Sequence, residues 1–357
     1  MLRRAIDVQN PGYALCMPGF LLLSPRATRL GEEGIDFQFG LLKVREMSAA
    51  ARVRPEEFFT PREWVRLSER STWKGLALVL HCWLVIGAAI TIGIHWPITL
   101  PLMVMIIGNR QLGLFILMHD AAHGLLHVNR RVNDRVALWF CGSELGSYRP
   151  YHLQHHRFVQ QTEDPDLLLS APFPITPSSL RRKVIRDLTG QTFFKQRIGT
   201  LVDQIRTRAT GAPLWALLLG KANSQRVFVV LNLTGLVLFS VAGLWWAWVL
   251  MWLLPMATWL PLVSRLRNIA EHALIEQNGT DPLRHARTTH ANFVERALIA
   301  PYWVNYHCEH HMFTQIPCWN LPMAHRLLAA KGITQHMEVQ AGYATVLRLA
   351  SARPTRA

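Results

Sequence analysis

Charged residues are scarce in this 357-residue chain, at 17% of the total, while hydrophobic residues make up 50%. The scarcity is concentrated: residues 76–94 and 227–263 contain no Asp, Glu, Lys or Arg, and residues 98–118 contain only Arg110. A membrane-spanning helix takes roughly 20 apolar residues. These stretches argue against an ordinary soluble enzyme and predict an integral membrane protein, in which the longest stretch supplies two spans.

Cysteine is also rare, and its five positions are scattered along the chain. No Cys-x-x-Cys pair occurs, which argues against a zinc ribbon, an iron–sulfur cluster and a disulfide framework. Cys308 lies among histidines and could be a thiolate ligand. The favoured interpretation is a small helical residue that faces away from any metal.

Acidic residues are outnumbered by basic ones, 23 to 38, which gives a net charge of +15. Nucleic-acid binding would explain this charge, but no motif or basic helix supports it. A basic surface facing anionic lipid is the favoured explanation. A docking surface for an acidic electron-carrier protein is the other. We therefore expect a lipid membrane, and no nucleic acid, among the partners.

The apolar stretches predict an all-α fold with four transmembrane helices, near residues 75–94, 98–118, 227–243 and 244–263. The turns within the two resulting hairpins, residues 95–97 and 242–243, carry no charge, whereas the connection 157–226 is rich in Arg and Lys. The positive-inside rule places the two turns outside and the connection in the cytoplasm. All four predicted histidine clusters, described below, then end in a cytoplasmic helical cap. We expect an integral membrane location, such as the bacterial inner membrane.

The chain divides into four predicted segments. Residues 1–46 mix Gly, Pro and Arg and are interpreted as a start-site extension or a disordered tail. Residues 47–73 form an amphipathic segment on the membrane surface, whose helix starts at the capping sequence Thr60-Pro61-Arg62-Glu63. The membrane domain follows at residues 74–335, and residues 336–357 form a C-terminal tail.

Histidine is unevenly distributed, because nine of the 16 histidines fall into four short clusters. The clusters are His119 with His123; His152 with His155 and His156; His272, with Asn268 four residues before it; and His307 with His310 and His311. Residues three or four apart share a helix face, so each cluster could aim its imidazoles at a common point. Imidazole suits zinc, copper, iron and nickel, and nine imidazoles exceed the four ligands of a tetrahedral ion. The count predicts two metal ions with four or five imidazoles each.

Two familiar metal signatures are missing. The zinc protease helix His-Glu-x-x-His does not occur, and neither does the Glu-x-x-His of soluble di-iron bundles. Carboxylates near the clusters are few: Asp120, Glu271 and Glu309, each next to a histidine in sequence. They could orient the imidazoles by accepting hydrogen bonds from ring N–H groups, or they could be solvated or capping acids. Both interpretations stay open.

The order His-x3-His, His-x2-His-His and His-x2-His-His, with hairpins between, resembles the membrane fatty acid desaturase/hydroxylase superfamily over about residues 74–331. His119-Asp120-Ala-Ala-His123-Gly124 resembles the first box of the acyl-lipid desaturases, and residues 306–311 resemble the third box. Residues 162–166 are similar to an acidic turn that follows the second box. Asn268 and His272 match an Asn/His pair that joins the metal site in that family.

The resemblance implies a non-haem di-iron centre on the cytoplasmic side, using O2 and two electrons. The nine clustered histidines would hold two Fe ions, with Asn268, Asp120, Glu271, Glu309 and His127 in a supporting or water-mediated role. The substrate would be a long hydrocarbon chain reached from the bilayer. No His-Pro-Gly-Gly haem motif of a fused cytochrome occurs. Electrons should therefore come from a separate ferredoxin, rubredoxin or cytochrome, docking on the basic surface at residues 181–208.

The reaction expected from these boxes is desaturation of a long-chain fatty acyl lipid. The first box has three intervening residues, unlike the stearoyl-CoA branch, which argues against an acyl-CoA substrate. A hydroxylase or ketolase of alkane, sterol or carotenoid would use the same boxes, because small differences in substrate position decide between these outcomes. A membrane metal-binding protein without redox turnover is the third possibility.

Overall fold

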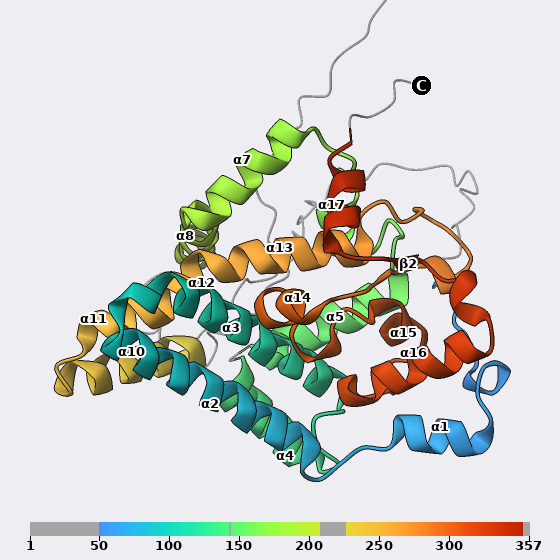
Figure 1. Ribbon diagram of the computed structural model, residues 1–357, viewed down its shortest axis with the longest axis horizontal. Coiled ribbons are helices and arrows are strands. Elements are labelled where there is room, and N and C mark those ends of the chain that lie inside the picture. The colour runs from blue at the N-terminus through green and yellow to red at the C-terminus, as the bar shows by residue number, and fades with distance from the viewer. Residues whose placement is uncertain (1–49, 143, 208–225, 353–357) are drawn as a thin grey trace, which may run out of the picture.

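The computed structural model describes residues 50–142, 144–207 and 226–352, and these residues are mostly helical (Figure 1). The helices and strands are α1 (Pro61–Ser68), α2 (Lys74–His95), α3 (Leu100–His123), α4 (Arg130–Val136), α5 (Leu145–Phe158), α6 (Leu167–Ser170), α7 (Pro177–Leu188), α8 (Gln191–Thr207), α10 (Arg226–Val241), α11 (Trp245–Trp248), α12 (Leu254–Ala257), α13 (Trp259–His272), β1 (Thr288–Thr289), α14 (Phe293–Leu298), α15 (His307–Met312), α16 (Leu321–Ala330), β2 (Val339–Gln340) and α17 (Tyr343–Ala350). Two π-helical turns, Ala137–Cys141 and Val249–Leu253, interrupt this series. The prediction for residues 1–46 lies outside the described residues.

The helix predicted to start at Thr60 is α1. The Thr60 hydroxyl accepts from the Glu63 N–H at 3.3 Å, and the Glu63 carboxylate accepts from the Thr60 N–H at 2.8 Å, which confirms the capping box. Leu67 of this helix is fully buried, and the Trp64 ring lies against Phe313. Part of the apolar face of α1 is therefore covered by protein.

Three helical stretches are long and apolar enough to cross a membrane: residues 74–95, 97–123 and 245–272. The first two are α2 and α3 with its preceding turn, and they pack against each other. The third joins α11, a π-helical turn, α12 and α13. The predicted fourth span, 227–243, corresponds to α10, which has 16 residues, fewer than the roughly 20 of a straight crossing. The described residues therefore contain three candidate spans where four were predicted.

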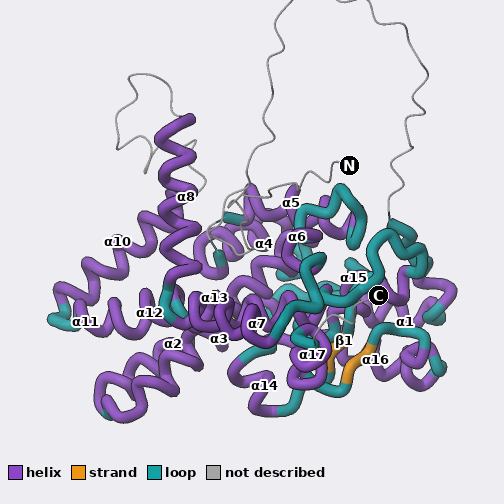
Figure 2. Tube along the Cα trace, turned by 90° about the horizontal axis from the view of Figure 1, so that it is seen from above, coloured by secondary structure: helices purple, strands orange, loops and turns teal. Residues whose placement is uncertain are grey.

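Helix α3 lies at the centre of the molecule (Figures 1 and 2). It contacts α2, α5, α13 and α14. In its most apolar stretch 61% of the residues are buried, against 28% in α2. The outer face of α2 exposes large apolar side chains, including Leu80 and Leu84, and a lipid environment would cover them. Burial thus separates a central helix, α3, from a peripheral helix, α2.

The C-terminal elements cover one end of α3 and α13. In Figure 1 the turns after α2 and α10 lie at the left, whereas α15, α16 and α17 lie at the right. The strands β1 and β2 pair in parallel, with Thr288 opposite Val339, and β1 contacts both α13 and α15. Because α3 and α13 end in His123 and His272, this arrangement brings both helix ends to the C-terminal helices.

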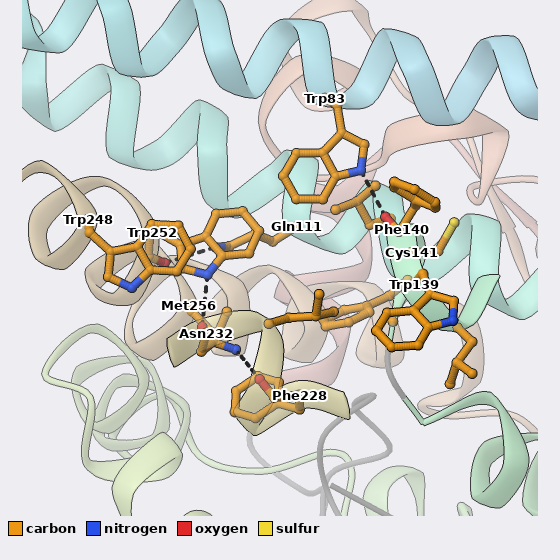
Figure 3. A pocket seen from close by; sticks show the side chains of 15 residues that line it. Trp83, Gln111, Trp139, Phe140, Cys141, Phe228, Asn232, Trp248, Trp252 and Met256 are labelled. Carbon is orange, nitrogen blue, oxygen red and sulfur yellow. Dashed lines mark hydrogen bonds between the residues drawn. The ribbon is translucent and has the colours of Figure 1, made fainter. Parts of the chain in front are cut away.

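A cavity with aromatic walls lies between α2, α3, α10 and the two π-helical turns (Figure 3). It opens among the candidate spans rather than among the C-terminal helices. Its wall includes Leu114 and Phe115 of α3, one turn before the first histidines. The cavity therefore lies along the same helix as the first histidine cluster.

Gly75 marks a close approach between α2 and the segment after α3. A Cβ atom at this position would lie 2.0 Å from the Leu126 carbonyl oxygen. We expect Gly75→Ala to lower the free energy of unfolding by about 1–3 kcal/mol, because backbone must shift to accept the methyl group. Thermal unfolding in detergent would measure the change. Gly87→Ala is the matched control on the same helix, since its Cβ would meet nothing within 4 Å; equal midpoints for the two variants would contradict the prediction.

Candidate metal centre

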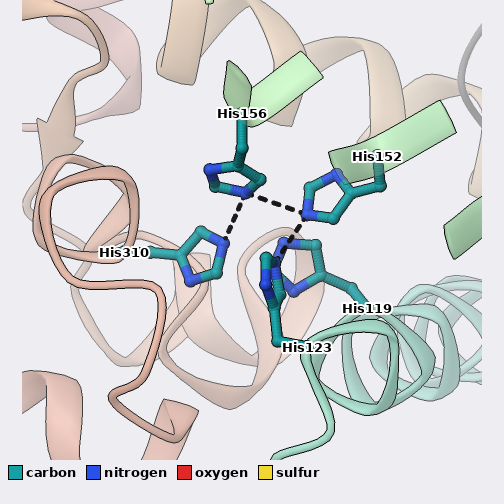
Figure 4. A group of neighbouring side chains, drawn as sticks. All are labelled: His119, His123, His152, His156 and His310. Atoms are coloured by element: carbon teal, nitrogen blue, oxygen red, sulfur yellow. Dashed lines mark hydrogen bonds between the residues drawn. The ribbon is translucent and has the colours of Figure 1, made fainter. Parts of the chain in front are cut away.

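Five histidines converge on one point inside the molecule (Figure 4). His119 and His123 come from α3, His152 and His156 from α5, and His310 from α15. Their potential ligand atoms all lie within 4.8 Å of one another. The Nε2 atom of His152 is 2.9 Å from that of His123 and 3.0 Å from that of His156, and His156 Nε2 is 3.0 Å from His310 Nε2. We call this set the five-histidine group.

Four further histidines form a second set beside it. They are His155 of α5, His272 of α13, and His307 and His311 of α15. His307 Nε2 lies 2.9 Å from His272 Nε2 and 3.0 Å from His311 Nε2. We call this set the four-histidine group. The two groups contain five and four imidazoles, as the histidine count predicted, and no other His, Cys, Asp or Glu of the described chain belongs to either.

The prediction that each cluster aims at a common point is wrong for the two triplets. On α5, His152 and His156 enter the five-histidine group while His155 enters the other. On α15, His307 and His311 enter the four-histidine group while His310 enters the first. The i,i+4 pairs share a face, and the third histidine of each triplet lies to one side of that face. Each of these helices therefore runs between the two groups and contributes to both.

Hydrogen bonds between the imidazoles cannot account for these short distances between Nε2 atoms. One ring nitrogen offers either one N–H or one lone pair, yet the Nε2 atoms of His152, His156 and His307 each face two other Nε2 atoms. Both ring nitrogens of buried His119 have no hydrogen-bond partner. Two imidazole nitrogens bound at right angles to one ion, each at about 2.1 Å, would be about 3.0 Å apart. The donor set and its spacings therefore fit one metal ion in each group.

Burial controls the charge of these imidazoles. Loss of solvation, followed by repulsion from neighbouring imidazoles, holds the pKa of His152, His156 and His310 well below the ordinary value. The same causes lower the pKa of His307 and His311. These side chains are therefore neutral near pH 7, which is the form that binds a metal ion.

His155 differs because a carboxylate holds its other nitrogen. Burial lowers its pKa, but Asp164 and Asp166 outweigh this effect and raise the pKa to about 9. His155 Nδ1 donates to Asp164 Oδ1 at 2.8 Å. The buried Asp164 also accepts from the N–H groups of Gln160 and Asp166. With Nδ1 engaged, Nε2 is the nitrogen left to face a metal, so Asp164 fixes the orientation of this ring.

The three carboxylates predicted to orient histidines have different partners. Asp120 lies 3.5 Å from His119 Nδ1, but its other oxygen accepts from the Cys318 N–H at 2.9 Å. Glu271 lies 3.6 Å from His307 Nε2 and accepts from Arg267 at 2.8 Å. The fully buried Glu309 accepts from His325 and from Thr288 and contacts no histidine of either group. None of the three makes the short contact that Asp164 makes.

Sequence reasoning therefore missed the contacts of two side chains, Asp164 and His325. Asp164 belongs to the acidic turn recognised by resemblance, but nothing in the sequence assigns its carboxylate to His155. His325, which donates to Glu309 at 2.5 Å, is an isolated histidine on α16. Its only sequence signal is that it follows the third box on a nearby helix.

Three other predicted residues lie outside the two groups. His127 Nδ1 accepts from the Asn129 N–H at 2.9 Å, in the turn after α3. Asn268 is buried on α13, one helical turn before His272. The Cys308 thiol lies 3.2 Å from the Leu283 carbonyl oxygen, which agrees with the interpretation that it faces away from the metals.

We expect Asp164→Asn to weaken metal binding at the four-histidine group by about 10- to 100-fold, the usual cost of losing a carboxylate that orients a ligand histidine. The amide would also present N–H groups near the buried turn. Titration of the metal-free variant with Fe(II), followed by metal analysis, would measure the change. Glu163→Gln, in the same turn, is the control, because Glu163 contributes no side-chain contact to His155. Unchanged affinity in Asp164→Asn would remove the orienting role.

Comparison with known proteins places these residues in context. The fatty acid desaturase family model matches residues 94–340, which include all nine histidines. A dihydrorhizobitoxine desaturase of Bradyrhizobium elkanii is 26% identical over 271 residues, covering 71% of this chain and 73% of that protein. A beta-carotene ketolase of a Paracoccus species is 28% identical over 258 residues, covering 69% of this chain and 88% of that protein. A second Paracoccus beta-carotene ketolase is 28% identical over 220 residues, covering 59% of this chain and 73% of that protein.

Proposed function

Because the chain belongs to the fatty acid desaturase family, we propose that it is a membrane-bound oxidoreductase that uses two iron ions and O2 to oxidise a long hydrocarbon substrate. The observation that carries the proposal is the convergence of nine imidazoles into a five-histidine and a four-histidine group. A bound non-haem iron pair supplies the oxidising power to break an unactivated C–H bond, which no amino-acid side chain has.

The residues of the chain have three tasks in this proposal. The nine histidines would hold the ions, each through one ring nitrogen. Asp164 orients His155 through a 2.8 Å hydrogen bond. Burial of His152, His155, His307 and His310, each at most 4% exposed, keeps water away from the reacting groups. Exclusion of water matters because it protects reactive species from side reactions.

The product we propose first is an alkene in a long-chain acyl lipid. The acyl-lipid-like first and third boxes and the relationship to a desaturase support this reaction. Removal of hydrogen from two adjacent carbons gives the double bond, whereas transfer of oxygen to the first carbon gives an alcohol. The position of the substrate chain against the metal centre decides between the two.

A second candidate is oxygenation of a carotenoid. It is favoured by the relationship to two beta-carotene ketolases and by the aromatic walls of the cavity beside α3. Both candidates use the same metal centre and differ in the substrate and in the fate of the oxidised carbon.

We further propose that the centre faces the cytoplasm and receives electrons from a separate ferredoxin, rubredoxin or cytochrome. Helix α7 supports this proposal, because it exposes Arg181, Arg182 and Arg186. An acidic carrier would be attracted to such a surface. The described part of the predicted basic connection ends at residue 207.

The test combines metal and product analysis of the purified protein. We expect two irons per chain, together with O2-dependent conversion of labelled acyl lipid to an unsaturated product when a reductase system is added. Mass spectrometry would identify the product. Hydroxylated or ketone products would contradict the desaturase assignment and keep the oxidoreductase. Zinc alone, or no metal, would contradict the oxidoreductase and favour a non-redox protein.

A further inference from the structure

Helix α15 supplies three of the nine imidazoles of the metal centre, yet it has only six residues. His307 and His311 belong to the four-histidine group, and His310 belongs to the five-histidine group. Isolated helices shorter than about 12 residues are marginally stable in water. The residue at the start of this helix, Tyr306, makes no side-chain capping bond either. Contacts with other segments must therefore hold α15 in place.

Glu309 lies on the side of α15 that faces away from the metal centre. Successive residues of an α-helix point about 100° apart, so His307, His310 and His311 share an arc of about 100°. By the same geometry Glu309 points about 150° away from the middle of that arc. Its side chain is fully buried, and a buried carboxylate is costly unless it accepts hydrogen bonds. The partners of Glu309 therefore lie on the back of the helix that carries the histidines.

Two side chains from other segments hold this carboxylate. His325 of α16 donates from Nδ1 to Glu309 Oε1 at 2.5 Å, and the Thr288 hydroxyl of β1 donates to Glu309 Oε2. The same hydroxyl accepts from the Cys308 N–H at 3.3 Å, which is one of the N–H groups that the first turn of a helix leaves without a partner. The back of α15 is thus joined to both β1 and α16.

The two donors are themselves restrained. Thr288 is fully buried, pairs with Val339 of β2 and forms an antiparallel bridge with Tyr306. The His325 side chain is only 14% exposed, and its ring lies against that of Tyr306, with centroids 5.2 Å apart. Packing and hydrogen bonds of this kind hold a supporting side chain in one orientation. The Glu309 carboxylate is therefore held between two donors of fixed position.

We infer that His325 is a positioning residue, which acts through Glu309 to fix the rotation of α15 about its axis and so places imidazoles at both metal positions. The inference rests on the proposed metal centre and assigns to it a residue that belongs to neither histidine group. A rotation of α15 would move its three histidines together, and a misplacement of about 1 Å can cost about 100-fold in rate. Loss of the His325 bond would leave a buried carboxylate with one partner fewer, which favours such a movement.

Titration of the full-length, metal-free protein with Fe(II), followed by metal analysis, would test the inference without any turnover. We expect His325→Leu to weaken binding at both metal positions by about 10- to 100-fold, the usual cost of losing a residue that supports a metal ligand. His325→Asn should restore most of the affinity, because the Asn amide nitrogen is as many bonds from Cα as Nδ1 and can donate in its place. His290→Leu is the matched control. The exposed His290 ring lies 5.4 Å from that of His325, centroid to centroid, and the described residues show no bond from it to Glu309.

Gly75→Ala separates positioning from a general loss of stability. This change at the start of α2 should lower the unfolding midpoint and keep the wild-type affinity for Fe(II). The inference would be overturned if Gly75→Ala and His325→Leu lost affinity alike at similar midpoints. Tight binding of both irons by His325→Leu would also overturn it, and so would a loss confined to one metal position, because α15 serves both.

The outcomes also separate this inference from the proposed function. Weaker binding at both positions in His325→Leu, in a protein that gives no oxidised product from any substrate, would support the positioning role and contradict the oxidoreductase. Full iron binding and turnover in His325→Leu would leave the oxidoreductase intact and remove the role of His325. A wild-type protein that binds no Fe(II) would contradict both.

Discussion

Alanine at His155 and alanine at His156 should each reduce turnover by at least about a thousandfold, the scale seen when one member of a catalytic unit is removed, but through different metal positions. The two residues are neighbours in sequence. His156 belongs to the five-histidine group and His155 to the four-histidine group. Each variant should lose the ion of its own group, because one imidazole of that group is gone and only three or four remain. It should keep the other ion, because the intact group still has its full set of imidazoles.

Iron analysis combined with Mössbauer spectroscopy of the remaining ion would distinguish the two variants. His156→Ala should match His123→Ala, and His155→Ala should match His272→Ala, since these pairs share a group. His127→Ala is the control and should keep both ions and full activity, because its imidazole lies in neither group. The same residual spectrum from His155→Ala and His156→Ala would contradict the division into two groups.

Asp187→Ala should cost about 3–5 kcal/mol of stability, the usual result of leaving one member of a buried ion pair alone. The Asp187 side chain is fully buried and accepts from Arg265 at 2.5 and 2.9 Å and from the Thr192 hydroxyl at 2.6 Å. The Arg265 side chain is only 15% exposed. Because this pair ties α7 to α13, its loss should release α7 from the helix that ends in His272.

Thermal unfolding and limited proteolysis in detergent would measure this effect. The midpoint should fall, and cleavage within α7 should become faster. Glu57→Ala is the matched control, since Glu57 forms an exposed pair with Arg54 at 3.0 Å and such pairs contribute about 1 kcal/mol or less. A similar midpoint for the two variants would show that the buried pair does not hold α7 in place.

The sequence predicts the donors of the metal centre but not their grouping. Helical periodicity states that His155 and His156 point about 100° apart. It does not state which other helix each imidazole meets, because that depends on how α3, α13 and α15 pack around α5. Asp164 and His325 were missed for the same reason. Their roles are contacts between segments, and no local pattern marks them.

The predicted end of the last span shows a second limit of sequence reasoning. The uncharged stretch ends at Val263, yet the helix continues to His272. The predicted span ended before two arginines, and each of them has a carboxylate partner. Arg265 pairs with Asp187, and Arg267 pairs with Glu271 at 2.8 Å. A count of charged residues treats each charge as facing water or lipid. Only the folded chain shows which charges have a buried counter-ion.

The shared use of α5 and α15 has a consequence for the spacing of the two metal positions. Each helix contributes to both groups, so neither group can move without carrying residues of the other. In the described residues neither group contains a carboxylate that could act as a bridge. The distance between the two metal positions is therefore set by the backbones of α5 and α15. This distance should stay the same when side chains around the centre are exchanged.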